Sequence, residues 1–97
     1  MTDKPDYTDW QQVAKLLNTA GTLEERIQLL TMLLTPDERD TMVARVNIFN
    51  ELLKGDLSQR QISQMLGVGV ATITRGSNEL KRLDDGEKAW LGKLLSK

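Results

Sequence analysis

A stretch of thirteen residues, LGVGVATITRGSN at positions 66–78, is almost free of charge. It carries one charge, that of Arg75, although 28% of all residues are charged. Two glycines lie near its start, and small and β-branched residues follow them. Three structures fit this pattern: a loop that binds phosphate, a buried strand, or a helix that contacts something other than water.

The phosphate-loop and strand interpretations fit the flanking sequence poorly. A phosphate-binding loop needs G-x-x-x-x-G-K-[ST], or G-x-G-x-x-G after a strand. Gly67 and Gly69 follow a segment with helical spacing instead, and no lysine stands at the required position. A buried strand would have no partner, because no second convincing strand is present. A helix is therefore the favoured interpretation.

The spacing within QRQISQMLGVGVATITRGS is typical of two short helices joined by a tight turn. Ile62 and Leu66 are one turn apart on the first helix. Gly67 falls where such a turn needs a positive φ, and Ile73 is placed to point into the core from the second helix. We therefore predict a helix–turn–helix at about residues 59–82 with its second helix outermost. An ordinary helical hairpin within a bundle is the alternative.

The same segment has a surface suited to DNA. Its charges are Arg60, Arg75, Lys81 and Arg82 against Glu79, whereas the chain as a whole has a net charge of −1. Small outward side chains allow a helix to lie deep in a major groove, and helix N-terminal groups can reach phosphate. The predicted DNA-binding residues are Gln59, Arg60, Val70, Ala71, Thr72, Thr74 and Lys81.

Most enzyme chemistry lacks candidate residues. The chain has no cysteine and no histidine, which removes thiol nucleophiles, imidazole bases and the usual zinc or haem ligands. The acidic residues Asp37, Glu38 and Asp40 are explained by a helix N-terminus. We expect no catalytic site and no metal site. Without a long apolar run or a signal-peptide core, the sequence also predicts a soluble cytoplasmic protein with no membrane partner.

The remaining pattern predicts one all-α domain over residues 1–97 with about six helices. Capping boxes are expected at five helix starts, which are Thr8/Gln11, Thr22/Glu25, Thr35/Glu38, Ser58/Gln61 and Asp84/Glu87. Gly55 is placed to end one helix in a left-handed conformation. A core this small and aliphatic often gains stability by dimerising.

Two segments, MLLTPDERDTMVARV and ELLKGDLSQRQISQMLGVGVATITRGSNELK, strongly resemble the tryptophan repressor family of enteric and related bacteria. The resemblance runs without gaps from about Trp10 to Lys81 and more loosely to the segment around Trp90. It implies an interlocked homodimer of six-helix chains, with the N- and C-terminal helices in the dimer core. It also implies a repressor that binds L-tryptophan as co-repressor and then a palindromic operator in double-stranded DNA, with no other cofactor.

The resemblance also assigns a tryptophan site. Arg75 would pair with the ligand carboxylate, helped by Thr35 of the other chain, and Arg75 and Arg45 of the other chain would sandwich the indole. The ligand-binding residues implied are Arg45, Arg75, Thr35, Met32, Leu34, Gly76 and Glu79, with the carbonyls of Met32 and Leu34 accepting from the ammonium. Outside the family, Arg45 is an ordinary solvated or ion-paired arginine, Thr35 a helix cap and Arg75 a phosphate contact.

The chain departs from the family's best-known pattern at three positions. Glu79 replaces a serine close to the ligand amine, Val68 replaces an alanine in the turn, and Ser63 stands where a lysine would contact phosphate. The alternative function is a ligand-independent helix–turn–helix module, such as the DNA-binding part of a transposase. A helical interaction protein that does not bind DNA is a third possibility.

Overall fold

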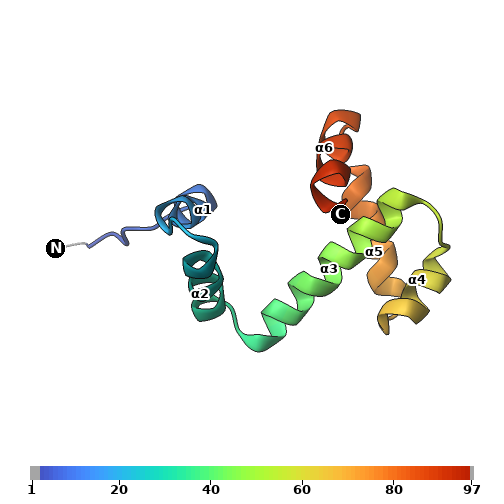
Figure 1. Cartoon of the computed structure of the whole chain (residues 1–97), viewed down its shortest axis with the longest axis horizontal. Coiled ribbons are helices and arrows are strands. Elements are labelled where there is room, and N and C mark those ends of the chain that lie inside the picture. The colour runs from blue at the N-terminus through green and yellow to red at the C-terminus, as the bar shows by residue number, and fades with distance from the viewer. Residues whose placement is uncertain (1–2, 97) are drawn as a thin grey trace. The chain divides into compact units, whose positions relative to one another are not determined.

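The computed structural model describes residues 3–96. Its elements in chain order are α1 (Trp10–Thr19), α2 (Leu23–Leu33), α3 (Pro36–Lys54), α4 (Gln59–Leu66), α5 (Val70–Lys81) and α6 (Asp85–Leu95) (Figure 1). No strand is present between residues 3 and 96. The prediction of an all-α chain with six helices is confirmed. No helix in this part of the chain combines the length and the apolar character needed to cross a membrane.

Short-range signals explain where the helices begin. Four of the five predicted N-caps are confirmed; they are Thr22, Thr35, Ser58 and Asp84. Both bonds of the predicted capping box form at the last three, whereas the Thr22 hydroxyl bonds both the backbone N–H and the carboxylate of Glu25. The cap predicted at Thr8 is wrong by one residue, since the carboxylate of Asp9 accepts from the backbone N–H of Gln12 at 2.8 Å. Thr8 and Asp9 are both good caps and each is followed three residues later by glutamine, so the local pattern could not choose between them.

The described chain separates into two compact units that divide between Arg39 and Asp40. The first unit contains α1, α2 and the first turn of α3, and none of its described residues is buried. Trp10, for example, is 75% exposed. The side chain of Arg26 holds the end of α1 by donating from Nε to the carbonyls of Leu17 and Ala20, at 2.8 and 3.0 Å. This unit therefore has internal hydrogen bonds but no apolar core. The single domain over residues 1–97 stays a prediction.

The second unit has a small core to which three helices contribute. Ile48 of α3, Ile62 of α4 and Ile73 of α5 pack together, and Ile62 and Ile73 are completely buried. Figure 1 shows α4 and α5 beside the C-terminal part of α3. Phe49, Leu52, Leu57, Leu66 and Val68 pack around these isoleucines. The predicted inward position of Ile73 is confirmed.

Two glycines end helices in this unit as predicted. Gly55 has φ 72° after α3, and Gly67 has φ 68° after α4. The carbonyl of Ser63 accepts from the backbone N–H groups of Gly67 and Val68, at 2.9 and 3.2 Å, and the Ser63 hydroxyl donates to the carbonyl of Val68. These bonds fix the three-residue turn that places α5 across α4. Gly69 then caps α5 without a side-chain hydrogen bond.

Candidate functional site

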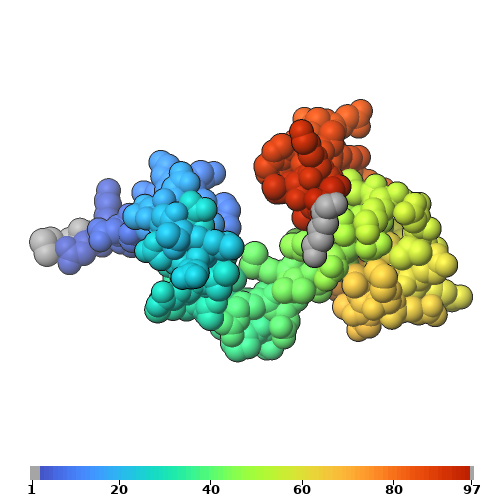
Figure 2. All heavy atoms as spheres, viewed as in Figure 1, coloured from blue at the N-terminus to red at the C-terminus, as the bar shows by residue number. Residues whose placement is uncertain are grey.

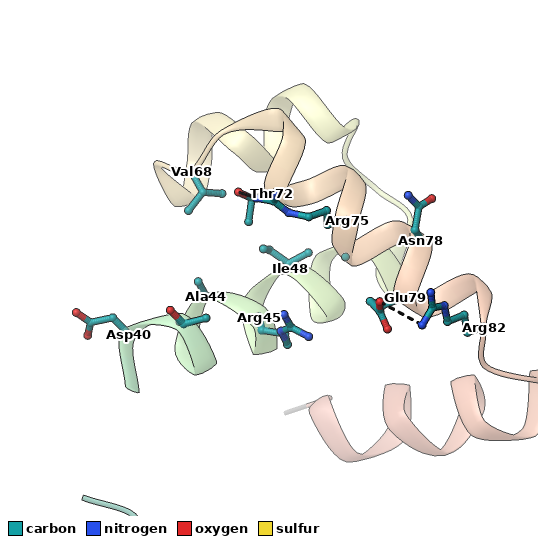
Figure 3. A pocket seen from close by; sticks show the side chains of 12 residues that line it. Asp40, Ala44, Arg45, Ile48, Val68, Thr72, Arg75, Asn78, Glu79 and Arg82 are labelled. Atoms are coloured by element: carbon teal, nitrogen blue, oxygen red, sulfur yellow. Dashed lines mark hydrogen bonds and ion pairs between the residues drawn. The ribbon is translucent and has the colours of Figure 1, made fainter. Parts of the chain in front are cut away.

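A groove of about 550 Å³ lies between α3 and α5 in the second unit (Figure 3). We call it the arginine groove. Its lining residues are Asp40, Thr41, Ala44, Arg45 and Ile48 from α3, Thr72, Arg75, Gly76, Asn78 and Glu79 from α5, Val68 from the turn, and Arg82 at the end of α5. Apolar atoms of Ala44, Ile48 and Val68 lie between the charged groups, so the groove offers both flat apolar contact and ionic contact.

Helical spacing places these residues on one face of each helix. On α3, Thr41, Arg45 and Ile48 follow at intervals of four and three residues. On α5, Arg75 and Glu79 are four residues apart, or about one turn. Each helix therefore presents a guanidinium to the same space. The two guanidinium groups line one groove because α3 packs against α5.

Gly76 sets how closely these two helices approach. A Cβ atom at this position would lie 2.7 Å from Cγ2 of Ile48, and 3.7 Å from Cε1 of Phe49. Ile48 is only 3% exposed, so its side chain has little room to move. Gly76 lies at a point where the helix backbone itself forms the wall of the groove. The need for glycine here comes from close packing, because no positive φ occurs at this residue.

The arginine groove contains three cations and two carboxylates. The cations are Arg45, Arg75 and Arg82, and the carboxylates are Asp40 and Glu79. Within residues 3–96 the ion pairs are Lys54–Glu51 and Arg82–Glu79, so neither Arg45 nor Arg75 is paired with a carboxylate there. The Nη2 of Arg75 donates to Oγ1 of Thr72 at 3.2 Å, which orients its guanidinium. The groove can therefore bind an anion between two available arginines.

The structure brings together four of the residues assigned by resemblance to tryptophan: Arg45, Arg75, Gly76 and Glu79 all line the arginine groove. Here Arg45 and Arg75 of the same chain share the groove, whereas the expectation paired Arg75 with Arg45 of another chain. Thr72, predicted to contact DNA, also lines the groove and accepts from Arg75.

Three further residues assigned to the ligand, Met32, Leu34 and Thr35, belong to the first unit. Met32 lines a separate apolar hollow between α1 and α2 and is largely exposed. Thr35 caps α3: its hydroxyl accepts from the backbone N–H of Glu38 at 3.2 Å, and its own N–H donates to the Glu38 carboxylate at 2.9 Å. The backbone N–H of Thr35 and, after it, the Thr35 side chain hold the pKa of the Glu38 carboxyl below its usual value, because hydrogen bonds to a carboxylate favour its charged form.

Sequence reasoning missed seven residues that line the groove, which are Asp40, Thr41, Ala44, Ile48, Val68, Asn78 and Arg82. Some could have been found by extending the helical face around Arg45, because Thr41 precedes it by four residues and Ile48 follows it by three. The position of Arg82 in the sequence did not indicate that it lines the groove. It follows the last residue of α5 and reaches the groove from the helix end.

The residues predicted to contact DNA lie on α4 and α5. Arg60, Val70, Ala71, Thr74 and Lys81 are exposed, and Gln59 is half-buried. Figure 2 shows the atoms of α4, in yellow, on the surface of this unit. Oγ1 of Thr74 donates to Oε1 of Gln59 at 3.0 Å and so links the start of α4 to α5. Because the Gln59 oxygen is used as an acceptor, its NH₂ group is left to donate to another partner.

The fold and the groove define a small all-α protein with a charged groove beside a pair of short helices. Among residues 3–96, no three acidic, histidine or cysteine side chains are grouped closely enough to hold a metal ion. A family model described as "Trp repressor protein" matches residues 8–95.

Named relatives agree with this match. Relatives named "Trp operon repressor homolog" include that of Vibrio vulnificus (strain YJ016), which is 62% identical over 95 residues, covering 98% of this chain and 93% of the relative. The relative from Aliivibrio fischeri (strain MJ11) is 63% identical over 97 residues, covering 100% of this chain and 90% of its own length. The relative from Vibrio cholerae is 62% identical over 95 residues, covering 98% of this chain and 92% of the relative.

The chain belongs to the Trp repressor family, and the resemblance seen in its sequence is confirmed. This is a family of transcription regulators, not of enzymes.

Proposed function

We propose that this chain is a tryptophan-dependent transcriptional repressor that acts in the cytoplasm as a homodimer. The dimer binds L-tryptophan as co-repressor and then a palindromic operator through a helix–turn–helix formed by α4 and α5. The observation that carries the proposal is the arginine groove, which Arg45 and Arg75 line together with the apolar side chain of Ile48, drawn between them in Figure 3. The groove adjoins α5, which is the helix proposed to enter the DNA.

The chemistry of L-tryptophan matches the groove. Its carboxylate would pair with Arg75, and its flat indole would stack between the guanidinium planes of Arg45 and Arg75. A cation over an aromatic face contributes about 0.5–2 kcal/mol, depending on how far water is excluded. The backbone at Gly76 forms part of the wall against which the ring would lie, and Glu79 lies within the same groove for the ammonium. Following the family resemblance, we propose that Met32, Leu34 and Thr35 of a second chain complete the site.

The exposed apolar side chains of the first unit support a homodimer. None of its described residues is buried, yet several of its large apolar residues are more than half exposed, namely Trp10, Leu23, Ile27, Met32 and Leu33. Soluble monomers rarely leave such patches uncovered. We propose that a second copy covers them, in the interlocked arrangement that the family resemblance implies.

Contact with DNA would begin at the N-terminal end of α4. The amide of Gln59, which Thr74 contacts, and the exposed guanidinium of Arg60 would bind phosphate or a guanine edge. Val70, Ala71, Thr72, Thr74 and Lys81 supply the remaining surface of α5. Two such surfaces must lie about 34 Å apart, the half-site spacing used by helix–turn–helix dimers, Trp repressors among them.

Ligand and DNA binding would be linked through α5, which contributes to both surfaces. Thr72 and Arg75 line the groove, while Thr74 on the same helix is exposed. A ligand that binds ten times more tightly to the DNA-competent position of α5 shifts the equilibrium by about 1.4 kcal/mol. This differential is sufficient for a tenfold change in operator affinity.

The test is fluorescence anisotropy of a labelled palindromic duplex, titrated with the protein at constant salt with and without L-tryptophan. We expect tight binding only when L-tryptophan is present. Equal binding with and without tryptophan would support the alternative, a ligand-independent helix–turn–helix module of the transposase kind. A panel of duplexes with varied half-sites serves as the control for operator choice, and absence of binding to all of them would contradict repression at a palindrome.

A further inference from the structure

We propose that Ser63 is a positioning residue for DNA recognition. Its hydroxyl donates to the carbonyl of Val68 and so fixes the place from which α5 begins, without contacting the DNA itself. The inference rests on the proposed function, because it assumes that α5 enters the operator. It goes further in naming a residue, outside both the arginine groove and the surface proposed to contact DNA, on which operator affinity depends.

The backbone of Val68 is hydrogen-bonded to α4 in both directions. Its N–H donates to the carbonyl of Ser63 at 3.2 Å, and its own carbonyl accepts from the Ser63 hydroxyl. The Val68 side chain packs against the core that contains Ile62 and Ile73. Since the hydroxyl bond is partly buried, removing its donor would leave the Val68 carbonyl without a partner where water has limited access. Val68 is therefore the fixed point from which the chain enters α5.

The start of α5 has no side-chain cap of its own. Gly69 is the N-cap residue, and its carbonyl accepts from the backbone N–H groups of Thr72 and Ile73 at 3.0 and 3.4 Å. Glycine has the least restricted backbone of any residue, and a Cβ atom at Gly69 would meet no atom within 4 Å. Neither a cap nor close packing at Gly69 therefore fixes the first turn of α5. Its position depends on Val68, the residue before.

The first turn of α5 belongs to the surface proposed to enter the DNA. Val70 and Ala71 are the first two residues of the helix, and both are exposed. Farther along the helix, Ile73 is buried in the core and holds the following turn. Loss of the Ser63 bond should therefore loosen the start of α5 and leave the rest of the helix in place. The net contribution of one hydrogen bond corresponds to about a two- to tenfold change in an equilibrium.

The first experiment is hydrogen exchange of backbone amides, followed by NMR on the full-length chain in the absence of DNA. The amides to follow are those that donate within the turn and at the start of α5, which are Gly67, Val68, Thr72 and Ile73. Ser63→Ala should raise their exchange rates about two- to tenfold. Alanine is a better helix former than serine, so this loss cannot come from α4 itself.

Two further variants complete this experiment. Ser63→Thr keeps the hydroxyl, so its four amides should exchange as they do in the unmodified chain. Ser96→Ala is the matched control, because it removes a hydroxyl that donates to the carbonyl of Gly92 at the end of α6, at 3.0 Å. It should leave the exchange of the four amides unchanged.

The second experiment is fluorescence anisotropy with L-tryptophan and the palindromic duplex to which the unmodified chain binds. Ser63→Ala should weaken operator binding about two- to tenfold, and Ser63→Thr should retain most of the affinity. Ser96→Ala should bind as the unmodified chain does. Circular dichroism of each variant verifies that the helices are retained.

The outcomes separate this role from its rivals. If Ser63→Ala weakens operator binding but leaves the four amides unchanged, the hydroxyl contacts DNA directly and the inference is wrong. It is also wrong if exchange rises throughout the chain, which would indicate a general loss of stability, or if operator affinity falls no further than in Ser96→Ala. If the unmodified chain binds no palindromic duplex, the proposed function itself fails, and the amides alone show whether Ser63 fixes the turn.

Discussion

Replacing Gly76 with alanine tests how closely α3 and α5 pack beneath the arginine groove. The added Cβ would lie 2.7 Å from Cγ2 of Ile48, which is about 0.7 Å inside an ordinary van der Waals contact. Ile48 is buried and β-branched, so it cannot turn aside without disturbing the core around Ile62 and Ile73. Overpacking of this kind costs about 1–3 kcal/mol.

A matched control removes the effect of helix propensity. Alanine is about 0.8–1 kcal/mol more favourable than glycine within a helix, and this gain offsets part of the clash. Gly92 lies within α6, and a Cβ there would meet no atom within 4 Å. We therefore expect Gly92→Ala to stabilise the protein and Gly76→Ala to be about 2 kcal/mol less stable than Gly92→Ala.

Urea unfolding followed by circular dichroism measures both variants. Protein concentration must be constant, because the stability of the proposed dimer would depend on it. The combination Gly76→Ala with Ile48→Ala should recover much of the loss caused by Gly76→Ala, since the clashing methyl is then absent. Equal stability of Gly76→Ala and Gly92→Ala would refute the close approach of the two helices.

Three further predictions concern charge and hydrogen bonding. Arg75→Lys should weaken L-tryptophan binding about tenfold in calorimetry while the helices are retained, because an ammonium replaces neither the planar stack nor the paired donors; an unchanged affinity would remove Arg75 from the site. Thr74→Val should weaken operator binding in anisotropy more than Thr74→Ser, because only serine keeps the hydroxyl that orients Gln59; equal losses would contradict that role. Low pH should destabilise the start of α3, because hydrogen bonds from Thr35 lower the pKa of the Glu38 carboxyl. The stability that these bonds give to the folded state is complete above the ordinary glutamate pKa and is lost as the pH falls through the lowered value. Between pH 7 and pH 3, the melting temperature of Glu38→Gln should fall less than that of the unmodified chain. An equal fall in both proteins would contradict this role of Glu38.

Much of the secondary structure was determined by residues close to one another in the sequence. A cap such as Ser58 acts on an amide three residues away, and Gly55 and Gly67 end helices through their own φ angles. The inward direction of Ile73 was also predicted from the sequence and is confirmed. These interactions span about one turn, so the sequence alone was sufficient to predict them. Asp9 shows the limit, because two adjacent caps were locally equivalent.

Only the tertiary structure decided which side chains share the groove. Arg45 and Arg75 are thirty positions apart, and their meeting depends on the contact between Gly76 and Ile48. Arg82 reaches the groove from a helix end, where periodicity no longer indicates a direction. Helical spacing predicts the face of the helix on which a residue lies. Which other helix that face contacts depends on how the whole helices pack. The sequence by itself therefore determined the helices, whereas the packing of α3 on α5 decided that two arginines, one glutamate and a glycine line a single groove.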